Sequence, residues 1–341
     1  MLLEKLSKCI GPSGYEEEIR EVIKEELYTF TDNVTVDRMG NVIVHSDGND
    51  NSSPKIMIAS HMDERGLIIT SYNDDGTLKF STLGKMEKDA LPCKTVLIGN
   101  KKVHGVIGIK PIHLQDKSER NKNISYDDMC IDIGASSKDE CRKIVLLGDF
   151  VVFDNSFSNF GDNLVKGKAL DNRIGCSILL ELLKEKYECN LYGMFYVQGN
   201  IDKRGIYTAA YNVKPDIMID LDTINSTDGE GVPEYLKTNE LTGGPVIPFN
   251  MEESIFNRDI VKSIRNKADN MGIAYKKSIS TKDTSKLKPV RLPINNCKTA
   301  AVLIPCKHMD YNISMCSLMD YESTLTLVKS YLSDLSDDYL L

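Results

Sequence analysis

The stretch KIMIASHMDE spans residues 55–64 and joins a short apolar run to a group of polar side chains. Its first half is consistent with a buried strand. His61 follows that strand and can present a ring nitrogen to a metal, while Asp63, two residues on, faces the same side and can orient the histidine. Taken alone, such a pair is more often a structural histidine with its partner. Other motifs in the chain are therefore needed to distinguish a metal ligand from a structural histidine.

Outside residues 66–163, predicted helices and strands alternate along the chain. Apolar residues at spacings of three and four indicate the helices, and short apolar runs between turn residues indicate the strands. Such alternation predicts an α/β domain in which a mixed sheet is flanked by helices. Residues 1–10 form a short amphipathic helix by the same spacing and not a secretion signal. Further helices are expected at residues 15–30, 174–184, 204–211, 254–270 and 321–335, and the other strands at residues 34–37, 41–44, 191–198, 216–222 and 300–304.

Residues 66–163 have a different character, because short β-type runs separated by turn residues dominate there. This pattern predicts an inserted β-barrel-like domain. The α/β domain then consists of residues 1–65 and 164–341. The runs that indicate strands in the insert are residues 67–71, 95–98, 103–109, 144–147 and 149–153.

Composition narrows the class of protein. The 341 residues suggest about two domains, and 41% hydrophobic with 27% charged residues is typical of a globular protein in water. The net charge of −8 disfavours nucleic acid and anionic membranes as partners. Nine cysteines without a CxxC pair disfavour a disulfide framework or a structural zinc site and suit the reducing cytoplasm.

A second motif, GKALDNR, covers residues 167–173 and opens a predicted helix. The carboxylate of Asp171 could bridge two metals, because it has two oxygens to share. The simpler alternative is that Asp171 or Asn172 only caps the helix.

A third motif, DIMIDLD, covers residues 216–222 and ends a predicted strand. Asp220 and Asp222 alternate onto one face at the end of the strand, where open α/β sheets bind ligands. Two carboxylates that face one way are unfavourable without a cation or another partner.

Together these motifs resemble those of the tetrahedral aminopeptidase family, the glutamyl and deblocking aminopeptidases, whose members are often labelled endoglucanase or cellulase M. The resemblance covers nearly the whole chain. It implies a zinc-peptidase-like fold, hydrolysis of N-terminal residues from short peptides, and two divalent metals (zinc, cobalt or manganese). It also implies that the β domain makes a dimer contact within assemblies of up to twelve subunits. The matching segments are residues 11–16, 61–64, 104–108, 131–135, 167–173, 215–216 and 243–245, with Asp320.

The resemblance also assigns site residues. The family holds its two metals with two histidines, two aspartates and one glutamate. His61 falls on the first histidine, Asp171 on the bridging aspartate and Asp222 on the second aspartate. Asp63 falls on the residue that orients the first histidine, so these four positions are retained.

Three other positions depart from the family pattern. Gly199 stands where the family has its general base, Asn200 where it has the glutamate ligand, and Asp310 where it has the second histidine. A glycine cannot accept a proton, and a positioned acid or base contributes about 10²–10⁴-fold to a rate. The neutral oxygen of Asn200 is a poor zinc ligand. The oxygen-rich set that remains favours magnesium, manganese or calcium, with one metal or none bound.

Several nearby residues could compensate. Glu64, Asp202 and His308 could each supply a group to the centre, although surface or supporting positions are more common for such residues. Arg173 could position Asp171 or form a surface ion pair. Two lone histidines in the insert, His104 and His113, are left out of the site.

We therefore expect a metallo-aminopeptidase-family protein with a degenerate metal site and weak or absent activity. The alternative is a non-catalytic subunit that binds peptides or takes part in assembly. A glycosidase ranks last, because the carboxylates suit metal ligation and the chain has no tryptophan to stack against sugars. The expected partners are a short peptide and further copies of the chain, as a dimer up to a dodecamer, with neither nucleic acid nor membrane.

Overall fold

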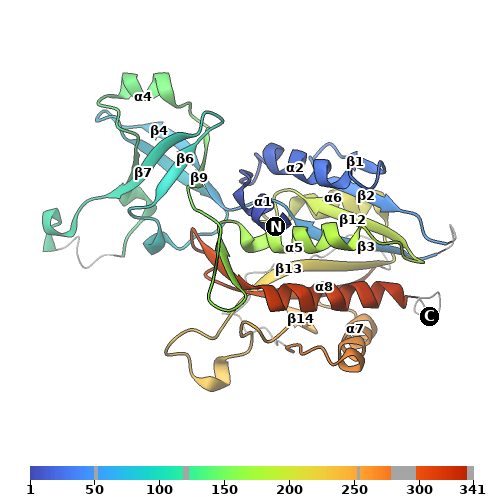
Figure 1. Ribbon diagram of the computed structural model, residues 1–341. Coiled ribbons are helices and arrows are strands. Elements are labelled where there is room, and N and C mark those ends of the chain that lie inside the picture. The colour runs from blue at the N-terminus through green and yellow to red at the C-terminus, as the bar shows by residue number, and fades with distance from the viewer. Residues whose placement is uncertain (50–52, 118–122, 252–253, 278–296, 336–341) are drawn as a thin grey trace.

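The structure is a computed structural model that describes residues 1–49, 53–117, 123–251, 254–277 and 297–335. A layered α/β body carries a barrel at one end, and the two are joined through the segments around Gly66 and Phe153 (Figure 1). This is the predicted fold class, a mixed sheet flanked by helices with a β-barrel domain. Among the described helices, none has both the length and the apolar character needed to cross a membrane.

A nine-stranded sheet forms the centre of the α/β body, in the order β1-β2-β12-β3-β13-β16-β17-β11-β10. Its four inner strands are parallel and almost entirely buried, while the outer strands pair antiparallel. Long apolar runs such as residues 55–60 form inner strands because helices cover both faces of a parallel sheet. The strands are β1 (Val34–Val36), β2 (Val42–Ser46), β3 (Lys55–His61), β10 (Ser158–Phe160), β11 (Leu164–Gly167), β12 (Asn190–Tyr196), β13 (Ile217–Asn225), β16 (Lys298–Lys307) and β17 (Ser314–Ser317).

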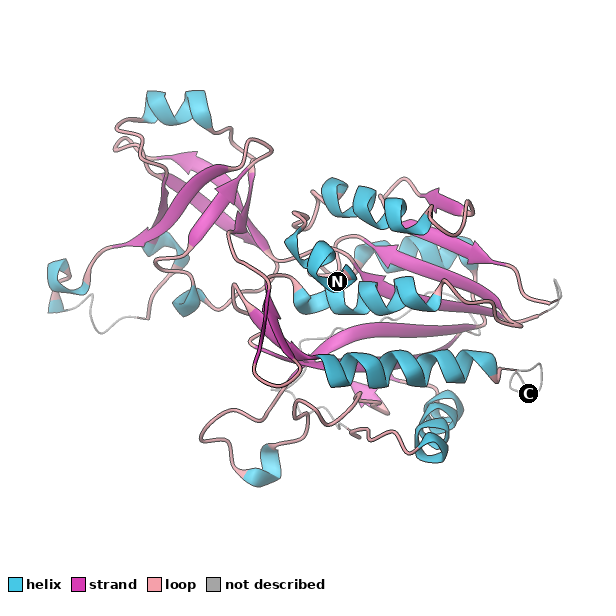
Figure 2. Ribbon diagram, in the orientation of Figure 1, coloured by secondary structure: helices cyan, strands magenta, loops and turns pink. Residues whose placement is uncertain are grey.

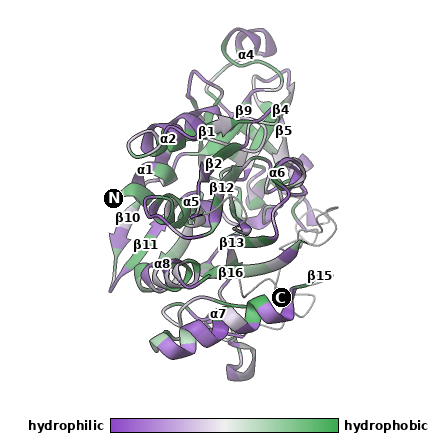
Figure 3. Ribbon diagram, turned by 90° about the vertical axis from the view of Figure 1, so that its right-hand side faces the viewer, coloured by the Kyte–Doolittle hydropathy of each residue, from purple (hydrophilic) through white to green (hydrophobic). Residues whose placement is uncertain are grey.

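Helix α5 packs at the centre of one face of this sheet, between α1 and α8, and α6 covers the other face (Figure 2). Every residue of α5 except Glu181 is buried. Apolar residues gather on the inner strands, whereas hydrophilic residues dominate the outlying α7 (Figure 3). The helices are α1 (Leu2–Lys8), α2 (Glu17–Leu27), α5 (Leu170–Leu182), α6 (Arg204–Val213), α7 (Arg258–Met271) and α8 (Leu318–Ser333).

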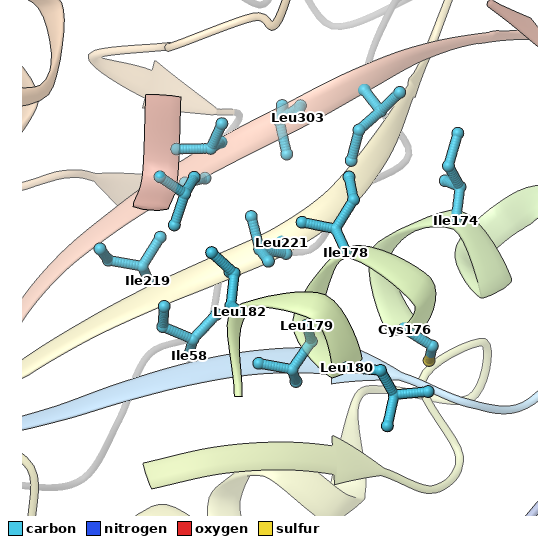
Figure 4. Close-up of a cluster of buried hydrophobic side chains, with 14 of the residues drawn as sticks. Ile58, Ile174, Cys176, Ile178, Leu179, Leu180, Leu182, Ile219, Leu221 and Leu303 are labelled. Carbon is cyan, nitrogen blue, oxygen red and sulfur yellow. The ribbon is translucent and has the colours of Figure 1, made fainter. Parts of the chain in front are cut away.

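The main core lies between α5 and the sheet. Ile178, Leu179 and Leu182 of α5 lie over apolar side chains of β3, β13 and β16 (Figure 4). Leu221 of β13 belongs to this core, while its neighbours Asp220 and Asp222 point to the other side of the strand. The packing of α5 thereby fixes which side of β13 carries the carboxylates.

The insert is a closed barrel in the order β4-β5-β8-β7-β6-β9, with antiparallel pairing throughout. A separate apolar core fills it. Two of its strands, β5 and β8, are absent from the sequence prediction, because these strands are short and their apolar residues alternate with polar ones. The strands are β4 (Gly66–Tyr72), β5 (Leu78–Leu83), β6 (Thr95–Ile98), β7 (Val103–Ile109), β8 (Met129–Asp132) and β9 (Phe150–Phe153).

One strand prediction in the insert, at residues 144–147, is wrong. Residues 144–147 form no strand: Ile144 is the last residue of helix α4 (Lys138–Ile144), at the end of the barrel (Figure 1), and residues 145–147 follow it without regular structure. Ser137 caps this helix by accepting a hydrogen bond from the backbone of Glu140. The sequence prediction read the apolar residues as a strand and overlooked the helix start at Ser137. Similarly, α7 begins at Arg258 and not at residue 254, because Asn257 caps it.

Truncation of the core should test the central role of α5. We expect Leu179→Ala to lower the free energy of unfolding by about 2–5 kcal/mol, because the side chain is fully buried and leaves a cavity. The matched control is Met319→Ala on α8, where the side chain is 51% exposed and the change should stay within about 0.5 kcal/mol. Urea unfolding of both variants provides the measurement. Equal losses in the two would contradict this account of the core.

Candidate functional site

The site lies where strands β3 and β13 part. β13 pairs with β3 only as far as Asp220, opposite Ala59, whereas its pairing with β16 continues to Asn225. Beyond this point β3 ends at His61 and the chain leaves for the barrel. The gap between neighbouring strands gives side chains at the carboxyl end of the sheet room to converge, as is usual for ligand sites in open α/β sheets.

Three of the residues that the sequence predicts as metal ligands meet in this gap. His61 Nε2 lies 3.4 Å from Asp171 Oδ1 and 3.7 Å from Asp222 Oδ1, and all three side chains are buried. Their ligand atoms lie within 4.8 Å of one another, so they could hold a metal ion. Thr223 fixes both carboxylates, because its hydroxyl donates to Asp171 Oδ1 (2.5 Å) and its backbone N–H donates to Asp222 Oδ1 (2.8 Å).

Asp63 lies behind His61, with its Oδ1 3.2 Å from His61 Nδ1. The same carboxylate accepts hydrogen bonds from the Ser13 hydroxyl (2.5 Å) and from the backbone N–H groups of Gly199 (2.6 Å) and Asn200 (3.0 Å). Burial alone would raise the pKa of Asp63, but His61 and these donors outweigh it and lower the pKa. Asp63 is thus an ionised anchor that joins three segments of the chain.

Neither Asn200 nor Gly199 supplies an acid to the centre. The Asn200 side chain donates from Nδ2 to Asp63 Oδ2 (3.1 Å) and is therefore directed to Asp63. At Gly199, an added Cβ would lie 2.3 Å from His61 Cβ, which is closer than real contacts allow. The loop therefore runs directly against His61, and a glutamate at position 199 would require the loop or His61 to move.

Arg65 is a site residue that the sequence analysis missed. Its Nη1 lies 2.7 Å from Asp171 Oδ2 and donates to the Met309 carbonyl (2.6 Å), and its Nη2 lies 3.7 Å from Asp310 Oδ1. The substituted ligand position Asp310 thus faces a guanidinium and not the His61 group. The available signal was the place of Arg65 directly after Glu64 in the first motif.

Lys203 is the second missed residue. Its Nζ lies 2.6 Å from Asp220 Oδ2 and 3.0 Å from Asp222 Oδ2, and its side chain is only 7% exposed. Burial alone would lower the pKa of Lys203, but the two carboxylates outweigh it and raise the pKa. Lys203 lies in a polar loop just before a helix. Lysines in such loops are usually solvated, so the sequence did not predict its burial.

These charges also set the protonation of the centre. Burial opposes ionisation of Asp171, but Arg65 and His61 outweigh it and hold its pKa below the usual range. Burial alone would lower the pKa of His61, whereas its hydrogen bonds to Asp171 and Asp63 raise it well above the usual value.

The described residues fit one metal ion and do not fit two. His61 Nε2, Asp171 Oδ1 and Asp222 Oδ1 face one another and make one set of donors. The remaining oxygens, Oδ2 of both aspartates, bind Arg65 and Lys203. A second ion would need those oxygens, and neither Asn200 nor Asp310 is directed to replace them.

A cavity of about 420 Å³ opens over this group. Its wall includes the His61 group together with Lys85 and Asp202. Of the three residues considered as surrogates, Asp202 is therefore at the cavity. Glu64 instead binds Lys168 (2.6 Å), and His308 lies edge-on to Tyr311, 5.7 Å between ring centroids.

The two expectations for Arg173 are both wrong. Its side chain is fully buried, which excludes a surface ion pair. It donates to the Leu6 carbonyl (3.0 Å) and lies 3.9 Å from Glu64, so it ties α1 to the core and leaves Asp171 to Arg65.

Comparison with known proteins gives matches over almost the whole chain. A sequence profile of the M42 glutamyl aminopeptidase family matches residues 40–327. A protein of Acetivibrio thermocellus that is named as an aminopeptidase is 33% identical over 330 residues, 96% of each chain. A TET aminopeptidase structure from Thaumarchaeota archaeon SCGC AB-539-E09 has a TM-score of 0.92 at 31% identity and covers 99% and 97% of the two chains. The TET1 peptidase of Pyrococcus horikoshii, which can assemble into a tetrahedron or a large octahedral shell, has a TM-score of 0.83 at 31% identity, with 98% of each chain covered.

Glu16 lies beside this site and titrates abnormally. Its carboxylate accepts hydrogen bonds from the N–H groups of Gly14 (2.8 Å) and Gln198 (3.0 Å) and is buried. Burial, with the charge of Asp63, raises the pKa of Glu16 to about 7. A folded-state pKa above the unfolded value near 4.5 favours the folded state at low pH, and that stability is lost as the pH rises through about 7.

We therefore expect Glu16→Gln to stabilise the protein at pH 8 by about 1–3 kcal/mol and to change little at pH 5. The amide keeps the acceptor oxygen but removes the charge. Urea unfolding at pH 5, 6, 7 and 8 measures the difference. Glu17→Gln, at the exposed next residue where α2 begins, should follow the wild-type profile. Parallel profiles for Glu16→Gln and the wild type would show that the Glu16 pKa is normal.

Proposed function

Because the chain belongs to the M42 glutamyl aminopeptidase family, we propose that its cavity binds the amino-terminal end of short peptides and hydrolyses them weakly or not at all. The family assignment agrees with the resemblance drawn from the sequence motifs. It supports a peptidase function for the class of protein. The low activity that we propose rests on residues that are specific to this chain.

One observation carries the proposal: the position of the expected general base is Gly199, packed against His61. Neither Gly199 nor Asn200 offers an acid to a substrate, and the second of these binds Asp63. The loss of a positioned base lowers a rate by about 10²–10⁴-fold. Among the acids on the cavity wall, Asp202 is the one that stands outside the His61 group and the Arg65 contacts, and we assign any residual activity to it.

The cavity itself supports a peptide ligand. Its volume of about 420 Å³ is within the range of pockets for small ligands. Its wall carries Asp202 and Asp310, which suit a cationic amino terminus, and Lys85, which suits a carbonyl or carboxylate oxygen. An ordinary short peptide offers both kinds of group. The alternative proposal, a non-catalytic peptide-binding or assembly subunit, needs the same contacts without turnover.

Assembly into a homo-oligomer, from a dimer up to a dodecamer, is part of the proposal. It draws on the TET1 peptidase that assembles into closed shells and on exposed apolar side chains of the barrel domain. We also assign the protein to the cytoplasm, because its cysteines are free. The exposed apolar residues in question are Ile112, Leu114, Leu146 and Leu147.

Turnover is tested with a panel of aminoacyl p-nitroanilides in the presence of zinc, cobalt or manganese. We expect kcat/KM at least about 100-fold below that of an active tetrahedral aminopeptidase assayed in parallel, because the base is missing. His61→Ala, purified in the same way, measures any contaminating peptidase. A kcat/KM within tenfold of the active enzyme, absent from the His61→Ala protein, would overturn the proposal.

Peptide binding is tested by calorimetry with a set of tripeptides and their N-acetylated forms. We expect the unmodified peptides to bind at least about tenfold more tightly, because acetylation removes the charge that the cavity carboxylates recognise. Asp202→Asn should reduce this preference, and Asp259→Asn, an exposed residue on α7, should leave it unchanged. Equal affinity for both peptide forms would exclude recognition of the amino terminus.

A further inference from the structure

Two side-chain cations divide the carboxylates of the centre between them. Lys203 bridges Asp220 and Asp222, at 2.6 and 3.0 Å. Arg65 lies 2.7 Å from Asp171 and 3.7 Å from Asp310. All four carboxylates are buried. Each pair therefore has its own positive group.

Such groups are needed because a buried carboxylate without a counter-charge is strongly unfavourable. A divalent ion can supply the charge, and so can an ammonium or guanidinium group that also donates hydrogen bonds. Here Lys203 and Arg65 already provide both charge and hydrogen bonds. The centre therefore has an internal source of the charge that its acids require.

A divalent ion and these side-chain cations cannot occupy the same space beside the carboxylates. A divalent ion binds carboxylate oxygens at about 2.0–2.6 Å. The Lys203 ammonium lies 2.6 and 3.0 Å from Oδ2 of Asp220 and Asp222, so it stands where an ion on those oxygens would lie. The Arg65 guanidinium stands in the same relation to Asp171 Oδ2. An ion would have to displace a largely buried cation from its partners.

Asp220 adds an independent observation. It lies deeper in the sheet than Asp222, where β13 is still paired with both β3 and β16, and it is outside the group of three donors around His61. Lys203 is its hydrogen-bond partner. A metal at the His61 group would leave Asp220 dependent on Lys203, so the presence of this acid is explained by the lysine and not by a metal.

We propose that Lys203 and Arg65 are resident counter-cations that take the place of a pair of divalent ions, so that this centre is formed and held without a dinuclear metal. The inference deepens the proposed function, since it concerns the same site, but it makes a separate statement about metal. Activity and metal content can therefore be measured independently.

The first experiment is metal analysis of the full chain. Protein treated with EDTA is incubated with Mn²⁺ or Zn²⁺, passed through gel filtration, and analysed for metal, and its thermal midpoint is recorded with EDTA and with each ion. We expect fewer than two equivalents per chain, and a cooperative thermal transition of folded protein in EDTA. Two retained equivalents, or loss of the folded state in EDTA, would overturn the proposal.

The second experiment removes each cation in turn. Lys203→Met and Arg65→Met should lower the thermal midpoint in EDTA, because each leaves carboxylates without a counter-charge. Added Mn²⁺ or Zn²⁺ should restore it, with an affinity about 100-fold above that of the wild type, since the ion no longer competes with a side chain. A variant that binds metal no better than the wild type overturns the assignment of the residue changed.

Lys168→Met is the matched control. Lys168 is also a buried lysine on a buried acid, 2.6 Å from Glu64, but it lies outside the His61 group. Its loss should lower the midpoint without a gain in metal binding. Equal rescue of Lys168→Met by metal would show that the response is non-specific and overturn the proposal.

If Lys203→Met does not fold, Lys203→Met combined with Asp220→Asn answers the same question. This variant removes the buried acid together with the lysine and keeps His61, Asp171 and Asp222 as donors. The expected gain in metal affinity is the same, and its absence overturns the proposal. A wild type that is inactive but holds two ions would refute this inference alone, whereas an active protein that holds fewer than two would refute the proposed function alone.

Discussion

The centre of this molecule depends on the charge balance of buried aspartates in the gap between β3 and β13. The parting of these strands brings acids from three segments together, and each needs a positive partner because its side chain is buried. Lys203 and Arg65 meet this need from within the chain. The fold of the family is retained almost completely, with a TM-score of 0.92 to a TET aminopeptidase structure.

The surrounding fold explains why the acids stay in place. Helix α5 packs its apolar side chains on the face of β13 opposite Asp220 and Asp222, which fixes the direction of both carboxylates. Asp63 fixes the histidine and the following loop through its hydrogen bonds to Ser13 and Gly199. Rotation of the β13 aspartates would disturb the packing of the core, and rotation of Asp63 would break its hydrogen bonds with the loop. The arrangement of charges is therefore a property of the fold and not of a flexible surface.

Much of this could be predicted from the sequence, and the limits have physical causes. Long apolar runs identified the inner strands, and HxD, Asp171 and Asp222 converge because parallel strands end at one edge of the sheet. The strand predicted at residues 144–147 was wrong because apolar character alone does not distinguish the end of a helix from a strand. Arg65 and Lys203 were missed because a charged residue in a loop reveals nothing of its burial, which arises only when distant segments pack together.

The loop from Gln198 to Lys203 links the changes at the site. Three of its residues, Gln198, Asp202 and Lys203, have left-handed backbone conformations, and Gly199 is held against His61. The absence of an acid at one end of the loop and the buried lysine at the other thus belong to one backbone conformation. A side chain added at Gly199 alone would collide with His61 while the rest of the loop kept its shape. The segment is therefore a single conformational unit, in which a change at one end requires the backbone up to the other end to adjust.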